Sequence, residues 1–221
     1  KKNSLTRFFT DYNTCNNSEV VNYEEMQKKD LFNLTLRPRL NSSSLSVKNS
    51  VSSSNNTDFD NKIGFGFGVE AEFILPFNKN KWSILIEPTY QNYKSEKTNK
   101  AVSGVSGGQL TGTVDYSSIE VPVSLRHYFF LNNGSKLFAN ISFVFDTSSK
   151  STIDFKRGNG SNFNSLDVES RSNLAFGMGY KLHDKYSLEM RYQFGREILS
   201  NYLTWNSDYK TLSIIFGYSL F

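Results

Sequence analysis

The side chains of this sequence that could take part in chemistry are two histidines and a set of charged residues that alternate with apolar ones. His127 lies three residues after Ser124, and alternating strand positions of opposite parity point to opposite faces, so these two cannot act as nucleophile and base. His183 and Cys15 stand alone, and no HxH or CxxC spacing offers a metal site. The glycines of GFGFG do not open a helix and form no phosphate-binding loop. We therefore expect no enzymatic activity, no cofactor and no metal.

The charged side chains alternate with apolar ones. In the segment IEVPVSLRHYFF, residues 119–130, the first four odd positions are apolar and the even ones are polar, small or charged. The same pattern elsewhere gives polar faces with five carboxylates and five cations: Glu70, Glu72, Glu87, Glu120 and Glu189, and Arg37, Arg39, Arg126, Lys181 and Arg191. Most of the cations are arginines, whose planar fork pairs carboxylates in a confined space. We expect these ten residues to form a charge network inside a narrow barrel.

The strands that must carry these faces number eight. Alternation predicts strands near residues 31–40, 62–75, 82–91, 119–130, 137–146, 173–181, 186–194 and 211–220. Short turns at 76–81, 131–136 and 183–185 alternate with long Ser/Asn-rich loops at 41–60, 95–113, 148–168 and 200–208. This layout predicts an all-β fold: an eight-stranded antiparallel up-and-down transmembrane β-barrel over residues 31–221. Both barrel ends would then be periplasmic and the long loops extracellular.

Glycines and aromatic residues indicate which face meets lipid. Five glycines, Gly64, Gly66, Gly68, Gly177 and Gly179, fall on the polar face, where they would make room for side chains in a narrow lumen. Aromatic residues near strand ends on the apolar face suit a membrane interface: Trp82, Tyr90, Tyr180, Tyr186 and Tyr218. The alternative is a soluble ligand-carrying barrel, which would have to pack roughly thirty large apolar side chains into a lumen that holds one small ligand. With ten charged side chains in the lumen, we expect no pore.

Composition agrees with a strand-built membrane protein. Mean hydropathy is −0.47, and no apolar run approaches the roughly 18–20 residues of a spanning helix. The net charge is +4 and the lysines fall mainly in turns and loops, so no nucleic-acid partner is expected. The chain begins at Lys1 without Met or an apolar signal segment, which suggests a processed or truncated product.

Residues 1–30 differ from the rest of the chain. Leu5, Phe8, Phe9 and Tyr12 fall at helix spacing. Two interpretations stay open: a short amphipathic helix that docks on a partner, and a frayed end. In either case we expect a short, partly helical periplasmic segment ahead of the barrel.

Several segments carry a family resemblance. The sequences IEVPVSLRHYF, GFGFGVEAEF, YSLEMRYQFG and SIIFGYSLF resemble the outer-membrane β-barrel ("porin family") domains common in Bacteroidota, over about residues 31–221. Residues 1–30 are similar to linkers that precede such barrels in flavobacterial proteins of unknown function. The resemblance implies a Gram-negative outer membrane, where lipid and lipopolysaccharide surround the barrel, and it implies no substrate.

Two functions are compatible with these features. The first is a non-enzymatic scaffold or accessory subunit of an envelope complex, with other outer-membrane or periplasmic proteins as partners. The second is a surface adhesin or ligand-binding barrel that uses the four long loops.

Overall fold

The longest strand, β5 (Gln109–Phe130), shows how the sequence builds the barrel. Its even residues from Leu110 to Tyr128 point inward and are buried, whereas Ile119, Leu125 and Phe129 on the outer face are 46–53% exposed. The 22 residues of this strand are about twice the roughly 9–11 that cross a bilayer as a tilted strand. The computed structural model describes residues 8, 11–12, 15, 31–52, 55–100, 102, 104–131, 134–148, 151–169 and 171–221.

Eleven strands and one short 3₁₀ turn occur among the described residues. The other strands are β1 (Phe32–Asn49), β2 (Thr57–Leu75), β3 (Trp82–Ile86), β4 (Thr89–Lys100), β6 (Ser135–Ser148), β7 (Thr152–Arg157), β8 (Asn162–Asp167), β9 (Asn173–Leu182), β10 (Tyr186–Arg196) and β11 (Trp205–Ser219), with η3 at Asn78–Asn80. All of the pairings are antiparallel. No helix in this described part of the chain is long and apolar enough to cross a bilayer.

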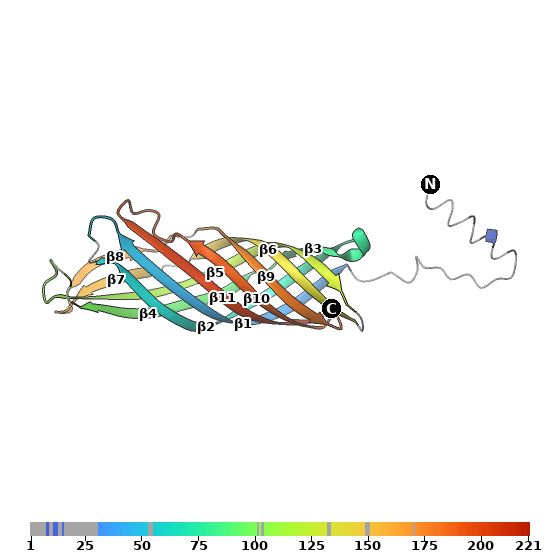
Figure 1. Ribbon diagram of the computed structural model, residues 1–221, viewed down its shortest axis with the longest axis horizontal. Helices are drawn as coiled ribbons and strands as arrows, with labels where there is room; N and C mark the ends of the chain where they lie inside the picture. The colour runs from blue at the N-terminus through green and yellow to red at the C-terminus, as the bar shows by residue number, and fades with distance from the viewer. Residues whose placement is uncertain are drawn as a thin grey trace. The chain divides into compact units, whose positions relative to one another are not determined.

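The strands form the barrel seen in Figure 1, and their pairings close it in the basal tier as a ring with eight positions. β1 pairs with both β2 and β11, which joins the first strand to the last. β3 and β4 both lie between β2 and β5, β6 and β7 both pair with β5, and β8 and β9 continue the next position. The expected all-β antiparallel barrel is confirmed, but three of its eight positions are interrupted. Between β3 and β4 the break falls at Glu87–Pro88, where proline has no N–H for the ladder.

The barrel has two tiers of opposite chemistry along its length. The basal tier, nearest Leu31 and Phe221, has apolar side chains outside and polar ones inside. The distal tier consists of Gln109–Ser118 of β5, β7, β8 and the adjoining ends of β1, β2, β4 and β11; it lies at the left of Figure 1. In the distal tier the pattern is reversed, and its interior is an apolar core made of Leu45, Val47, Phe59, Tyr93, Val102, Val105, Leu110, Val114, Tyr116, Ile153, Phe155, Leu166, Ile198, Leu199, Trp205 and Tyr209.

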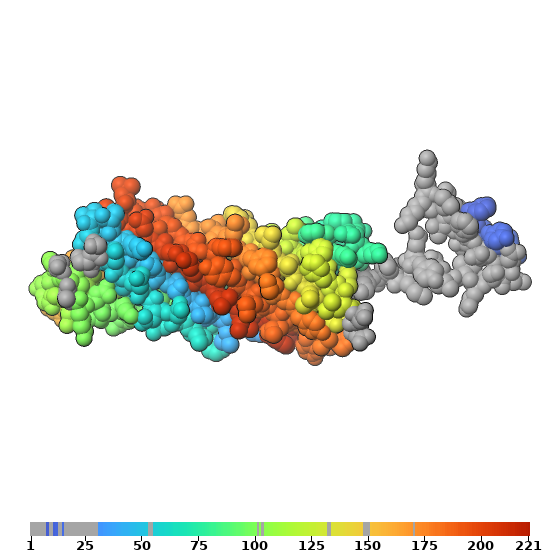
Figure 2. All heavy atoms as spheres, viewed as in Figure 1, coloured from blue at the N-terminus to red at the C-terminus, as the bar shows by residue number. Residues whose placement is uncertain are grey.

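The distal tier corrects the expectation of four irregular loops. Strands occupy much of 41–60, 95–113, 148–168 and 200–208, and short connections remain only at their tips. Alternation continues through these segments, but here the apolar side chains point inward, so Ser46, Lys48 and Glu96 lie on the outer wall. In the space-filling view, strands of both tiers form a continuous wall on the visible face (Figure 2).

The chain divides into two units, Lys1–Asp30 and Leu31–Phe221. In the first unit, Phe8, Asp11, Tyr12 and Cys15 are described and have helical backbone. The side chains of Phe8 and Tyr12 are 65% and 60% exposed. Leu5 and Phe9, the other two residues of the expected docking segment, lie outside the described residues.

Candidate functional site: the charged lumen and the distal tier

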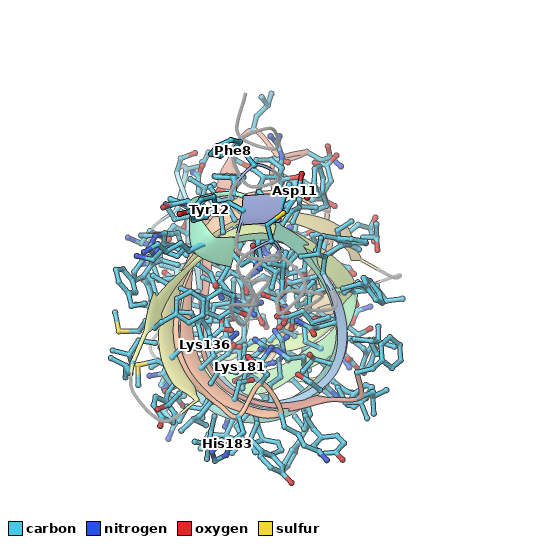
Figure 3. All side chains as sticks on the ribbon, turned by 90° about the vertical axis from the view of Figure 1, so that its right-hand side faces the viewer. Phe8, Asp11, Tyr12, Lys136, Lys181 and His183 are labelled. Atoms are coloured by element: carbon cyan, nitrogen blue, oxygen red, sulfur yellow. The ribbon has the colours of Figure 1, made fainter. Side chains whose placement is uncertain are left out.

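The structure places all ten charged residues of the expected network inside the basal ring. Each of them is at most 6% exposed: Arg37, Arg39, Glu70, Glu72, Glu87, Glu120, Arg126, Lys181, Glu189 and Arg191. Seen along the barrel, side chains fill the interior of the ring, with Lys136 and Lys181 among them (Figure 3). Because the interior excludes bulk water, every charge here needs a partner.

Arg126 is a central cation of the network. Its Nη2 lies 2.8 Å from Glu70 Oε2 and its Nη1 3.0 Å from Glu70 Oε1, a two-pronged ion pair between β5 and β2. Its Nε donates to Asn140 Oδ1 of β6 at 2.8 Å, and Nη2 lies 3.5 Å from Glu189 of β10. One side chain thus connects four positions of the ring.

Arg37 and Arg191 bind Glu87 and Glu189, two further carboxylates of the network. Arg37 forms ion pairs with Glu70 at 3.4 Å, with Glu87 at 3.5 Å and with Glu189. Arg191 binds Glu87 through Nη2 at 2.8 Å and Glu189 through Nε at 2.7 Å. Around these, Arg39 pairs with Glu87 and Lys181 pairs with Glu72 at 3.3 Å. Glu87 and Glu189 are therefore each shared by at least three cations.

Sequence alternation missed a second cluster, centred on Arg196. Its Nη2 lies 2.6 Å from Glu120 Oε1 and donates to the Tyr116 hydroxyl at 2.6 Å, and Nη1 lies 3.6 Å from Asp146. The ladder between β10 and β11 shifts register between Gln193 and Arg196, which turns Arg196 inward against the parity of its strand. Gly195 is the feature of the sequence that could have predicted this bulge, because glycine within a strand often marks one.

The lumen is electrically balanced. With the Arg196 cluster included, six cations face six carboxylates: Arg37, Arg39, Arg126, Lys181, Arg191 and Arg196 against Glu70, Glu72, Glu87, Glu120, Asp146 and Glu189. Lys136, near the basal rim, pairs with Asp184. Among the described residues, each of these twelve buried charges has an opposite charge within ion-pair distance.

Glycines provide the space for this network. A Cβ on Gly177 would lie 2.5 Å from Glu189 Oε1, and one on Gly68 would lie 2.6 Å from Thr89 Oγ1 and 3.2 Å from Glu87 Oε1. These contacts are closer than van der Waals distance, so a side chain at either position would displace a carboxylate of the network.

The histidine and serine of the rejected catalytic pair lie on opposite faces. Ser124 is buried in the lumen and hydrogen-bonds Ser142 at 2.7 Å. His127 lies on the outer wall, with its ring centroid 4.5 Å from that of Trp82 and 4.6 Å from that of Phe129. No cluster of metal-ligating residues occurs within the described ranges.

The five expected interface aromatics lie on the outer wall, and three of them, Tyr90, Tyr180 and Tyr186, are 40–52% exposed. The ladders place Trp82, Tyr180, Tyr186 and Tyr218 near the basal end and Tyr90 at the margin of the distal tier. Between these margins, the apolar face of β5 from Ile119 to Phe129 covers about 33 Å along the strand, or about 25 Å of height at a tilt of about 40°. That height matches the apolar band of an outer-membrane barrel.

A comparison with protein families shows to which family of barrels the chain belongs. Residues 27–195 match the model described as "outer membrane protein beta-barrel domain". The chain belongs to this family. The barrel is accordingly an outer-membrane β-barrel of a Gram-negative envelope.

Solved structures with a similar fold are distant in sequence. The barrel is similar to Ail, the attachment invasion locus protein of Yersinia pestis (17% identity, 85% of this chain and 99% of that chain, TM-score 0.40). It is also similar to neisserial surface protein A (14%, 83% and 96%, TM-score 0.42) and to OprG of Pseudomonas aeruginosa (14%, 85% and 95%, TM-score 0.47). No curated protein sequence matches the chain.

The distal tier has titratable groups on both faces. Outside, Lys97 donates to Asp60 at 2.8 Å and thereby lowers the pKa of that exposed carboxyl. Inside, burial raises the pKa of the Tyr93 phenol from 10 to about 12, and its hydroxyl donates to the Asp60 carbonyl at 3.1 Å.

Tyr93 predicts a loss of distal-tier stability in alkali. Because its folded pKa is raised, its contribution is complete below pH 10 and is lost as pH rises towards 12. We expect the resistance of the distal tier to urea to fall over this interval, and to fall less steeply in Tyr93→Phe, which cannot ionise. Urea unfolding followed by the fluorescence of Trp205 in this tier, with Trp82 replaced by Phe, measures the effect. Equal slopes for the two proteins would contradict the assignment.

Proposed function

We propose that this outer-membrane barrel is non-enzymatic and non-conducting, and that it displays the distal tier outside the cell as a rigid binding platform. One observation carries the proposal: the strands do not end at the margin of the apolar band but continue as a polar-walled tier with its own apolar core. Leu110, Ile153 and Phe155 in that core are fully buried. Binding residues on a rigid framework lose little conformational entropy when a ligand binds.

The tips of the distal tier supply contact residues. The loops at 50–52 and 197–204 lie side by side, joined by a hydrogen bond from Ser50 N to Thr204 O at 2.8 Å. Val51 and Leu203 in these loops are 79% and 101% exposed. The wall below them is rich in serine, threonine and paired charges such as Lys94 and Asp115. Apolar tips above a neutral polar wall suit a macromolecular ligand better than a small ion.

The filled lumen predicts the absence of conductance. We expect planar bilayers that contain the purified barrel to show no current steps beyond the protein-free baseline. The physical reason is that the neutral network closes the basal tier and the apolar core closes the distal tier. Regular single-channel steps that persist at moderate voltage would show an open path and contradict this part of the proposal.

The orientation can be tested with cysteine labels. In a Cys15→Ser background, Lys48→Cys places a thiol on the outer wall of the distal tier and Lys185→Cys places one in a basal turn. We expect a membrane-impermeant maleimide to label Lys48→Cys in intact cells and Lys185→Cys only after the outer membrane is permeabilised. The reverse pattern would place the distal tier in the periplasm and refute surface display.

Ligand binding can be tested by cell retention. Cells that display the chain should be retained on surfaces coated with extracellular-matrix proteins more than cells without it. Val51→Ser with Leu203→Ser should abolish the excess, whereas Val123→Ser, on the lipid-facing wall, should not. Equal retention of cells with and without the chain on every coating would count against a binding platform.

A second candidate function is the scaffold of an envelope complex. The observation that favours it is the pair Phe8 and Tyr12, which share helical backbone four residues apart and are both exposed. A helix with such a face could bind an outer-membrane or periplasmic protein. Deletion of residues 1–30 should then remove proteins that co-purify in mild detergent, and mass spectrometry of the eluates would identify them.

A further inference from the structure

The hydrogen-bond ladder between β2 and β4 stops part-way along the wall. In the described residues these strands share only the three pairs from Gly66↔Gln91 to Gly68↔Thr89, whereas the β4–β5 ladder continues to Lys100↔Gln109. On its other side β2 has a register shift against β1 near Ser43, and such a bulge bends a strand. We call the facing edges beyond the ladder, residues 57–65 of β2 and 92–100 of β4, the seam.

Side chains bridge the distal part of the seam. Tyr93 and Lys97 both bind Asp60, and Asn99 Nδ2 donates to the Asn56 carbonyl at 2.9 Å. Towards the basal tier the seam contains a hollow of about 200 Å³, lined by Lys62, Ile63, Gly64, Asn92, Tyr93 and Lys94. The seam is thus tied at its distal part and hollowed at the margin of the apolar band.

The hollow is lined by apolar Ile63, with Phe65 next to it on the outer face of β2, and by two lysines. Ile63 and Phe65 of β2 are 79% and 78% exposed, against 49% for Phe67 further along the same strand. Across the seam from Ile63, Lys94 has its ammonium 2.7 Å from Asp115. Lys62, on the same strand as Ile63, forms no ion pair within the described part of the chain. After Lys97, its charge also lowers the pKa of the nearby exposed Asp60 carboxyl. Exposed hydrocarbon beside ammonium and amide groups is complementary to a lipid, whose acyl chains are apolar and whose phosphate is anionic.

The hollow also lies at the level where headgroups occur. Ile63 is the first outward apolar residue of β2, and Tyr90 is the last on β4 before Asn92 and Lys94. A phosphate at this level would lie beside the lysines, and its acyl chains would extend along the apolar wall. An extended peptide fits less well, because the Asn92 carbonyl oxygen lies 3.0 Å from where a Gly64 Cβ would be, which leaves no room for a third strand.

We propose that the seam binds a phosphate-bearing membrane lipid, with the phosphate between Lys62 and Lys94 and an acyl chain against Ile63 and Phe65. Asn92 can donate a hydrogen bond to the same headgroup. A neighbouring hollow of about 370 Å³ shares both lysines but is also lined by Glu96 and Asp115, so its carboxylates disfavour an anion there. The proposal requires the apolar band to lie in a bilayer and does not depend on ligand binding at the distal tips.

Native mass spectrometry of the full chain in neutral detergent tests the site, with phosphatidic acid as the probe. We expect phosphatidic acid to stay bound, whereas diacylglycerol, with the same chains and no phosphate, does not. Inorganic phosphate in excess should not displace the lipid. Lys62→Gln and Lys94→Gln should each weaken binding about fivefold, and the double variant about 25-fold.

Lys210→Gln is the matched control. Lys210 lies on the outer face of β11, just beyond Leu212, and pairs with Asp208 at 2.6 Å much as Lys94 pairs with Asp115. We expect this variant to bind phosphatidic acid like the unmodified chain. Equal weakening by Lys210→Gln, unchanged binding by the double variant, or displacement by inorganic phosphate would overturn the proposal.

A photoactivatable phosphatidic acid locates the lipid independently of affinity. Crosslinked peptides should contain residues 62–65 or 90–94. Crosslinks distributed evenly around the ring would indicate annular lipid only and would overturn the specific site.

Discussion

Replacement of Arg126 by alanine is expected to lower the free energy of unfolding of the barrel by about 3–5 kcal/mol. The variant removes the two-pronged partner of Glu70 and leaves that carboxylate, 1% exposed, with Arg37 at 3.4 Å as its remaining ion-pair partner. The loss arises from the desolvated charge left behind rather than from the attraction alone. Urea unfolding in detergent, followed by the heat-modifiable migration of folded barrels on gels, measures it.

A double variant separates charge from packing. Arg126→Met with Glu70→Gln removes both charges and keeps similar volumes, so it should be more stable than Arg126→Ala. Lys94→Ala, which breaks an exposed pair with Asp115, should change stability by less than about 1 kcal/mol. If Arg126→Ala unfolds at the same urea concentration as Lys94→Ala, the buried network does not stabilise the barrel.

Replacement of Phe155 by alanine is expected to destabilise the distal tier by about 3–5 kcal/mol. The ring of Phe155 is fully buried and stacks on Trp205 with centroids 5.3 Å apart. Its removal leaves a cavity in the core that joins β7 to β11. Trp205 fluorescence in the Trp82→Phe background, together with limited proteolysis, should show loss of the distal tier at urea concentrations where the basal tier remains folded.

Phe145 provides the control for this effect. It occurs on β6, which precedes β7 at the same ring position, but it faces outward and is 48% exposed. Phe145→Ala should therefore leave distal proteolysis unchanged, since no core cavity is formed. Equal protease sensitivity of the two variants would argue that the distal core does not hold the tier together.

Strand parity predicted the basal tier because its apolar and polar faces differ sharply in every strand. Arg37, Glu70 and Glu189 could be assigned to one lumen without knowledge of their partners. Parity fails wherever a bulge intervenes, as it does before Arg196. Tyr128 shares the phase of Arg126 and could have been assigned to the lumen on that ground; its hydroxyl in fact donates to Glu72.

The rule that assigned apolar faces to lipid and polar faces to the lumen predicted the basal tier but could not predict the distal tier. Serine-rich stretches such as 41–60 look like solvated loops, although Leu45, Val47 and Phe59 recur within them at strand spacing. The outer face is apolar in the basal tier and polar in the distal tier, while the alternation itself continues. The apolar residues do change parity, for example from Leu34 and Leu36 to Leu45 and Val47, but the sequence alone does not say that this change marks the edge of the bilayer.

The closure of the ring by β11 has a consequence for how the molecule is made. β11 follows the other described strands along the chain, and among them it alone hydrogen-bonds both β1 and β10. Trp205 and Tyr209 complete the distal core from the same strand. A nascent chain that stops before residue 205 therefore has two open sheet edges and no sealed interior, so a stop codon ahead of that position would leave no closed barrel for the envelope to retain.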